Sequence, residues 1–277
     1  MTKLRITVVL LALVGALNSW SQGFGNRELI NADWYFNLGD IKYGGSEYFD
    51  HSEWRKLELP HDWSVEAVAS PELASCTGYL PGGIGWYRKD LDIPKVQNGN
   101  KVYIYFEGIY NNSEVFINGK WIGKRPNGYV SFMYELTPYL KFGGRNVLAV
   151  RVDHSQDADS RWYTGSGIYR DVYLVYANPV HIRLWGVSYS AKVNKKNAVL
   201  SVQTEVDNTG KLPVAVKVLH EVFDRDGKKV GAGSLDYSLR AGEMVKKELA
   251  VSIVQPKLWS LEDPYLYTIR TTLSKGG

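Results

Sequence analysis

The chain has 277 residues and a formal net charge of only +4, so it is long enough for one or two domains and gives no reason to expect nucleic-acid binding. Aromatic residues make up 13% of the sequence, and there are 27 glycines. This composition predicts strands joined by many turns, because aromatic side chains suit strands and glycine suits turns. The single cysteine, Cys76, cannot form an internal disulfide, so we expect hydrophobic cores to stabilise the fold.

Residues 1–21 have the pattern of a secretory signal peptide. Lys3 and Arg5 precede an apolar run over Ile6–Leu17, and Ser19–Ser21 places small residues where signal peptidase cleaves. The apolar run is too short to span a membrane stably. We therefore expect a secreted or periplasmic protein with no membrane attachment after cleavage.

The strongest local signal is Asn118-Gly119, which lies between the short apolar–polar runs 114–117 and 120–123. A type I′ turn needs positive φ at both central residues, so Asn-Gly predicts a β-hairpin here. Five further segments of the first half have the composition of strands: Ala32–Phe36, Trp86–Leu91, Lys101–Phe106, Asn146–Asp153 and Ile168–Tyr176.

Two motifs in the first half superficially resemble functional sites. The loop Ser70–Gly85 contains closely spaced glycines, but a strand rather than a helix follows it, so a phosphate-binding loop is not predicted. His61 and Asp62 form either a catalytic pair or a structural turn. Neighbours on an extended chain point to opposite faces, which favours a turn in which Asp62 caps backbone groups.

The second half changes character near Ala177-Asn178-Pro179, where a linker is predicted. Short strands with turn signals then recur: Val187–Ala191, Ala198–Glu205, Val214–Phe223, Lys228–Tyr237, Met244–Val251 and Leu266–Leu273. Asp224–Gly227 is predicted to be a tight hairpin turn. This regular pattern is typical of an immunoglobulin-like sandwich, and we expect its last strand to be missing after Gly277.

Six ordered motifs resemble glycoside hydrolase family 2, which contains β-galactosidases, β-glucuronidases and β-mannosidases, and the resemblance is nearest to the β-galactosidases. They are Leu59–Trp63, Gly83–Arg88, Phe106–Gly108, Val115–Gly119, Gly165–Val172 and Leu258–Tyr267. The resemblance implies an all-β fold: a jelly-roll, galactose-binding-like sandwich over 22–178, followed by an immunoglobulin-like sandwich over 179–277.

In that family both catalytic glutamates lie on a (β/α)₈ barrel, and this sequence has no matching alternation of strands and helices. We therefore expect the non-catalytic front of a retaining exo-β-glycosidase, inactive by itself, with no catalytic residue, metal or cofactor. Glu107, Glu114 and Glu135 are not assigned to catalysis. The expected partners are the terminal β-linked sugar of an oligosaccharide or glycan and the missing barrel of the same enzyme.

The resemblance also implies which residues meet the sugar. An Asp near the segment before Gly165 contacts the terminal sugar in several family members, and Asp159 is the nearest candidate. We add Arg161, Trp162 and Tyr163 as predicted substrate-binding residues, while a contact between domains stays open for Arg161 and Trp162. Two other functions also stay open: a stand-alone carbohydrate-binding module, and a structural protein of two sandwiches.

Overall fold

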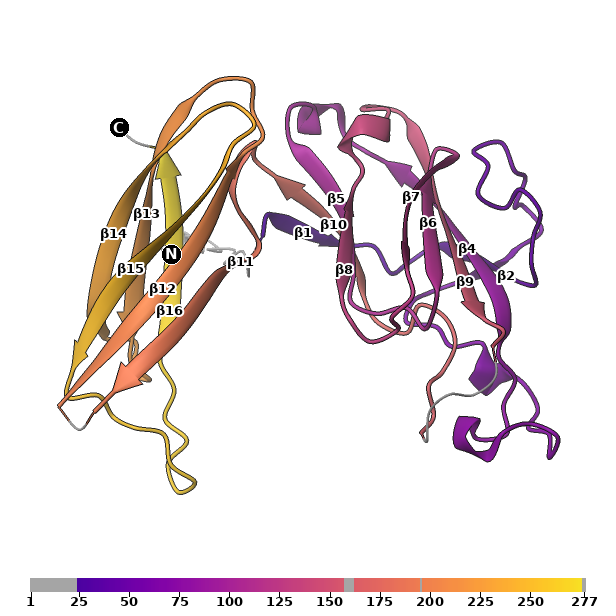
Figure 1. The fold of residues 1–277 in the computed structure, drawn as a ribbon. Coiled ribbons are helices and arrows are strands. Elements are labelled where there is room, and N and C mark those ends of the chain that lie inside the picture. Colours follow the sequence, from indigo (N-terminus) through magenta and orange to yellow (C-terminus); the bar gives the residue numbers. More distant parts are fainter. Residues whose placement is uncertain (1–23, 157–161, 195, 276–277) are drawn as a thin grey trace, which may run out of the picture.

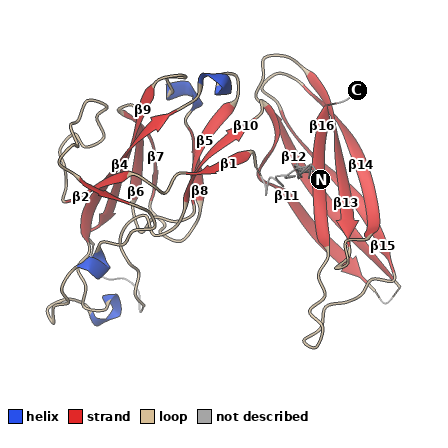
Figure 2. Cartoon of the chain, turned by 180° about the vertical axis from the view of Figure 1, so that it is seen from behind, coloured by secondary structure: helices blue, strands red, loops and turns tan. Residues whose placement is uncertain are grey.

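The computed structural model describes residues 24–156, 162–194 and 196–275. These residues form strands and four short 3₁₀ helices, arranged as two β-sandwiches side by side (Figure 1; Figure 2 shows the reverse side). The predicted signal peptide, Asp159 and Arg161 lie outside the described residues. Within the part of the chain that the structure describes, none of the helices has the length and apolar character needed to cross a membrane.

The first sandwich is a jelly roll whose paired strands are all antiparallel. Its two sheets have the strand orders β1-β10-β5-β8 and β3-β2-β4-β9-β6-β7. The strands are β1 Asn26–Leu29, β2 Trp34–Leu38, β3 Arg55–Leu57, β4 Gly83–Asp92, β5 Lys101–Phe106, β6 Ser113–Ile117, β7 Lys120–Arg125, β8 Phe132–Glu135, β9 Arg145–His154 and β10 Val172–Ala177. A single apolar core fills the space between the two sheets, with Trp34, Ile104, Phe106 and Val150 at its centre.

The predicted hairpin at Asn118-Gly119 is confirmed, and it joins β6 to β7. Asn118 and Gly119 have φ of 47° and 78°, as the turn type requires. The Asn118 side chain also binds β9: its Oδ1 accepts from the Val147 amide at 2.8 Å and its Nδ2 donates to Asn146 Oδ1 at 2.8 Å. The turn therefore sets the register of the hairpin against the strand beside it.

Several predicted strand boundaries were wrong: the strands predicted from Val187 and Leu266 begin at Val180 and Thr268. Two other wrong starts have a local cause. The strand predicted from Ala32 begins at Trp34, because Asp33 has φ of 58° and cannot extend a strand. The strand predicted from Ile168 begins at Val172, because the Ile168 carbonyl accepts instead from the His61 amide at 2.8 Å.

The second sandwich is immunoglobulin-like, with the sheet orders β11-β12-β15 and β14-β13-β16. Its strands are β11 Val180–Val193, β12 Asn197–Asn208, β13 Val214–Phe223, β14 Lys229–Leu239, β15 Met244–Val254 and β16 Thr268–Lys275. The predicted turn at Asp224–Gly227 joins β13 to β14 and is closed by the Asp224 amide donating to the Lys228 carbonyl at 2.9 Å.

The outer face of each sheet in the first sandwich is also covered. On the four-stranded sheet, Tyr103 and Val175 pack against Phe24 and Leu184, and the Phe24 ring meets His181 of β11 edge-on at 4.8 Å. On the six-stranded sheet, Trp86 and Ala149 lie beneath the segment 41–54, which contributes Ile41, Phe49 and Trp54. This double burial explains why β5 and β9 are apolar on both faces, as a strand covered on both sides requires.

A fully buried histidine links the two sheets of the second sandwich. His220 of β13 has its Nε2 3.0 Å from Thr204 Oγ1 on β12 and its Nδ1 3.0 Å from Thr271 Oγ1 on β16. Burial lowers the pKa of His220, so the ring stays neutral while one hydroxyl donates to it and the other accepts. Burial also lowers the pKa of His61 and His181.

These lowered pKa values predict that acid destabilises the protein. In the unfolded chain each histidine takes up a proton near about pH 6.5, whereas the folded state resists protonation until lower pH. The free energy of unfolding should therefore be constant above about pH 7 and fall as pH decreases below about 6.5, by about 1.4 kcal/mol for each unit of pKa depression. Urea denaturation at several pH values between about 8 and about 5 measures the slope.

His220→Gln is the matched variant, because it removes one of the three groups while keeping a side chain that donates and accepts. The difference in unfolding free energy between the wild type and His220→Gln should shrink as pH falls. The wild type loses stability through protonation of His220 in the unfolded chain, and the variant has no histidine there to protonate. If the unfolding free energy of His220→Gln falls with pH as steeply as that of the wild type, His220 does not contribute to the pH dependence.

Candidate functional site

Two of the sequence motifs, about a hundred residues apart, meet at one end of the first sandwich. The Leu59–Trp63 turn pairs with the segment Gly165–Ile168: the His61 amide donates to the Ile168 carbonyl at 2.8 Å and the Trp63 amide to the Ser166 carbonyl at 3.1 Å. This end is at the bottom of Figure 1, where β4 begins and β9 ends. We call the loops 61–82 and 162–168 together the loop end.

Asp62 holds the loop end together. Its Oδ1 accepts from the Ser64 amide at 3.0 Å and from the Ser166 amide at 2.8 Å, and its Oδ2 accepts from the Tyr163 hydroxyl. The prediction that Asp62 caps backbone groups in a structural turn is confirmed. The carboxylate therefore has a positioning role, because its oxygens are occupied by these donors.

His61 has partners of its own and does not pair with Asp62. Its Nε2 lies 2.8 Å from Arg55 Nη2 and 3.3 Å from Glu66 Oε1, and its Nδ1 lies 2.7 Å from the Tyr87 hydroxyl. Burial lowers the pKa of His61, against an opposing effect of Glu66, so the neutral ring accepts from Arg55 and donates from Nδ1. Burial likewise raises the pKa of Tyr87.

The two glycines of Gly165-Ser166-Gly167 allow the motifs to approach so closely. Both have positive φ, 71° at Gly165 and 124° at Gly167. A Cβ at Gly165 would lie 2.8 Å from Asp62 Oδ2, and one at Gly167 would lie 2.7 Å from the His61 carbonyl oxygen and would overlap the Tyr87 hydroxyl. Only glycine fits both the backbone conformation and the space.

Trp162 and Tyr163, two of the four predicted substrate-binding residues, are presented side by side on this scaffold. Trp162 is 59% exposed, yet its indole N–H donates to the Tyr129 hydroxyl at 2.8 Å. Tyr163 is partly exposed, and burial together with the Asp62 carboxylate raises the pKa of its hydroxyl. Both side chains are therefore positioned before any ligand arrives. Asp159 and Arg161, the other two, lie outside the described residues.

Sequence reasoning missed the residues that support this pair from behind. The Tyr110 ring meets Tyr129 at 5.4 Å and His154 at 4.9 Å, both edge-on. His154 Nδ1 lies 2.6 Å from Ser166 Oγ, which lies 2.6 Å from Ser64 Oγ. Asn127-Gly128-Tyr129, a turn sequence carrying an aromatic residue, was the available signal for Tyr129.

The glycine- and proline-rich loop predicted over Ser70–Gly85 reaches the same end. Ser64 Oγ donates to the Pro81 carbonyl at 2.7 Å and the Trp63 indole to the Gly82 carbonyl at 3.0 Å. A Cβ at Gly78 would lie 3.8 Å from the Tyr163 ring. The loop therefore stands beside the Tyr163 ring.

The loop end is suited to binding a polar ligand that has one apolar face. It presents aromatic rings with hydroxyl and indole groups fixed at their edges, which is a common way to hold a ring-shaped polar molecule. Among the described residues, no group of three or more His, Cys, Asp or Glu is arranged to hold a metal ion. Glu114 and Glu135 form ion pairs on the strands, with Arg151 at 3.7 Å and Lys101 at 2.7 Å.

Substituting Gly167 should destabilise the loop end more than a matched glycine elsewhere. Gly39 has the same φ of 124°, but a Cβ there would meet nothing within 4 Å. We expect Gly39→Ala to cost about 1–3 kcal/mol through backbone strain, and Gly167→Ala about 1–3 kcal/mol more through overlap with His61 and Tyr87. Urea denaturation of both variants measures the difference, and equal losses would show that the contact at Gly167 carries no cost.

Two sequence models of the same protein family match adjacent parts of this chain. The sequence model of the sugar binding domain of glycosyl hydrolases family 2 matches residues 29–179, and a second model, of glycosyl hydrolases family 2, matches residues 180–277. Together these matches extend over both sandwiches.

Individual relatives agree. Beta-galactosidase BoGH2A of Bacteroides ovatus is 43% identical over 252 residues, covering 90% of this chain and 30% of that protein. A putative beta-glucuronidase of Formosa agariphila is 36% identical over 249 residues, covering 89% of this chain and 23% of that protein. The crystal structure of a beta-glycosidase from Bacteroides vulgatus superposes with a TM-score of 0.80 at 41% identity, covering 91% of this chain and 32% of that chain.

This chain thus spans about 30% of the length of BoGH2A and less of the Formosa protein. The sugar-binding-domain model alone covers more than half of the 277 residues. The chain belongs to glycosyl hydrolases family 2.

Proposed function

We propose that this chain is the non-catalytic, sugar-binding front of a β-galactosidase-like exo-glycosidase, and that another part of the intact enzyme cleaves the bond. The observation that carries the proposal is the pair Trp162 and Tyr163, held on the outside of the family 2 sugar binding domain by Tyr129 and Asp62. In this proposal the loop end forms one wall of the sugar pocket. It limits cleavage to the terminal sugar and excludes water.

The chemistry assigned to the rest of the enzyme is that of a retaining glycosidase. One carboxylic acid protonates the leaving oxygen while a second carboxylate attacks the anomeric carbon, and the two groups stand about 5 Å apart. The chain accounts for 30% of the length of BoGH2A, which leaves room in such a relative for a separate catalytic part. Within the described residues, Asp62, Glu114 and Glu135 already have structural partners, which supports placing catalysis elsewhere.

The roles at the loop end follow from the side chains. Trp162 offers an indole face on which the apolar face of a pyranose can stack, while its N–H is already engaged. Tyr163 has its hydroxyl bound to Asp62, so it too contributes mainly a ring face. We assign Asp159 and Arg161 the hydrogen bonds to the sugar hydroxyls, on the strength of their place in the sequence.

We propose a terminal β-galactoside as the substrate. The support is the 43% identity to a protein named beta-galactosidase, against 36% to one named putative beta-glucuronidase. We also propose export through the signal peptide of residues 1–21, on the strength of its charged start, apolar run and small residues.

The first test is activity of the chain by itself. Purified protein of residues 22–277 should hydrolyse no aryl β-galactoside, because the proposal places both catalytic carboxylates outside these residues. The release of the chromophore is compared with a buffer blank and with a β-galactosidase as positive control. Turnover above the blank, or a glycosyl adduct on a carboxylate of this chain, would overturn the proposal.

The second test addresses Trp162 in the complete enzyme, once the coding sequence beyond Gly277 has been read. Trp162→Ala should raise the KM for an aryl β-galactoside about tenfold, the usual scale for losing an aromatic contact. Trp259→Ala is the matched control, since Trp259 is 57% exposed against 59% for Trp162 and lies in the second half of the chain. An unchanged KM with a lowered melting temperature would assign Trp162 to a contact between domains instead.

A further inference from the structure

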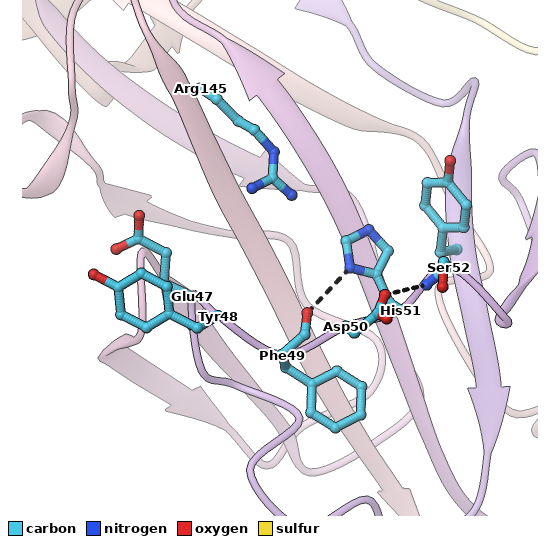
Figure 3. A pocket seen from close by; sticks show the side chains of 8 residues that line it. Glu47, Tyr48, Phe49, Asp50, His51, Ser52 and Arg145 are labelled. Atoms are coloured by element: carbon cyan, nitrogen blue, oxygen red, sulfur yellow. Dashed lines mark hydrogen bonds between the residues drawn. The ribbon is translucent and has the colours of Figure 1, made fainter.

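A second candidate binding surface lies away from the loop end, on the outer face of the six-stranded sheet. A hollow of about 510 Å³ there is lined by Tyr35, Glu47, Tyr48, Phe49, Asp50, His51, Ser52 and Arg145. Figure 3 shows the guanidinium of Arg145 turned into this hollow, with Glu47 and Tyr48 on one side and His51 and Ser52 on the other. No residue of the loop end lines it.

A neighbouring hollow of about 460 Å³ extends the surface along the sheet. It is lined by Tyr43, Gly44, Gly45, Ser46, Glu47, Tyr48, Trp86, Phe116, Asn118 and Gly119. The two hollows share Glu47 and Tyr48 as lining residues, so they adjoin each other, and we call them together the sheet groove. Two open hollows that adjoin along a sheet suit an extended chain molecule rather than a compact ligand.

The sheet groove has a rigid floor. Arg88 is fully buried beneath the segment 44–51, and its guanidinium donates to the carbonyls of Gly44 and Ser46, the latter at 3.0 Å, and to His51 Nδ1 at 3.2 Å. Burial lowers the pKa of Arg88 to about 10, which leaves it charged near neutral pH. These bonds fix the backbone of the segment that carries Glu47 and Tyr48, which line the groove.

Two glycines let the segment lie flat on the aromatic floor. A Cβ at Gly44 would lie 2.9 Å from the Trp86 ring, and a Cβ at Gly45 would lie 2.9 Å from the Phe116 ring. A buried cation and two constrained glycines are a costly way to cover a sheet, since apolar side chains would suffice. The groove therefore has a defined shape before any ligand binds.

The exposed side chains identify the ligand class. Tyr48 is 89% exposed and lines both hollows, and the exposed Tyr43 lines the second. A tyrosine ring offers a flat apolar surface with a hydroxyl at its edge, which matches a pyranose that has an apolar face and hydroxyls around its rim. Polar groups in the same lining as Tyr48, such as Ser52 and Asp50, complete this pattern.

The charges in the sheet groove are balanced, which excludes strongly charged ligands. Glu47 is ion-paired with Lys141, and Arg145 with Asp90 at 2.8 Å. Asp50 remains, with its pKa lowered by hydrogen bonds from the Ser52 amide and hydroxyl. The buried Arg88 cation beneath the segment offsets Asp50, so the groove has no net positive charge to attract polyanions such as nucleic acid or acidic glycans.

We propose that the sheet groove binds the interior of a neutral polysaccharide chain, as a site separate from the loop end. Stacking on Tyr48 and Tyr43 supplies the affinity, and the polar rim supplies hydrogen bonds to the sugar hydroxyls. The site would keep the protein on a polymer while the terminal sugar is processed elsewhere.

Affinity electrophoresis of residues 22–277 tests the proposal. Native gels contain galactomannan or mixed-linkage β-glucan as neutral polymers, and polygalacturonate as the acidic one. The neutral polymers should retard the protein and polygalacturonate should not. Tyr48→Ala should reduce the affinity for the neutral polymers about tenfold, the scale of an aromatic contact, and so reduce the retardation. Tyr43→Ala should reduce the affinity to a smaller extent.

Two control variants distinguish this site from the other surfaces. Tyr189→Ala, at a tyrosine that is 68% exposed on β11, should migrate like the wild type. Trp162→Ala should also be retarded normally, because a terminal-sugar site meets few chain ends in a long polymer. Equal melting temperatures show that each variant is folded.

Three results would overturn the proposal: no retardation by either neutral polymer, normal retardation of Tyr48→Ala, or loss of retardation in Trp162→Ala alone. The last of these would place polymer binding at the loop end. Failure of the groove leaves the KM test of Trp162 unaffected, so the two proposals fail separately.

Discussion

The carboxylate of Asp62 is the interaction on which the arrangement of the loop end depends. Its two oxygens join the turn that follows β3, the segment before β10 and the ring of Tyr163. Each of these segments lacks regular strand hydrogen bonds, so without a shared acceptor their amide groups would need water or a different path. One short acidic side chain thus adds to the two backbone hydrogen bonds that join these segments beyond the ends of the sheets.

The rest of the first sandwich keeps these loops at a fixed place. Its two sheets are buried on both faces, the four-stranded one against Phe24 and β11 and the six-stranded one beneath residues 41–54. Strands covered on both sides resist sliding, because a one-residue shift would exchange buried positions for others that do not fit. The two sheets therefore fix the positions of the loops at the loop end, although the contacts that set the register of the sheets lie far from it.

Much of the fold could be predicted from the sequence, because its signals are local. Asn118-Gly119 dictates its own turn through φ, and alternation along β12 or β13 follows from burial on one face. The boundary errors at Asp33 and Ile168 arose where one residue's conformation or a distant partner overrides composition. Family resemblance supplied the sandwich types, which strand spacing alone leaves ambiguous.

The candidate site was harder to predict, since it depends on contacts between distant segments. Asp62 could be recognised as a cap because neighbours on an extended chain point to opposite faces, but its bond to the Ser166 amide spans more than a hundred residues. Tyr129 as the partner of Trp162 had no sequence signal stronger than an aromatic residue in a turn. The local patterns of one sequence do not indicate which residues far apart in the chain are in contact.

The buried guanidinium of Arg88 has a consequence for how this surface can change over time. The backbone of residues 44–51 takes its shape from acceptors that point at the cation, not from what its side chains touch in solvent. Exchanging Ser46, Glu47 or Tyr48 for other residues would leave that backbone where it is. Recognition on this face can thus diversify by point substitution, with little effect on the protein's stability.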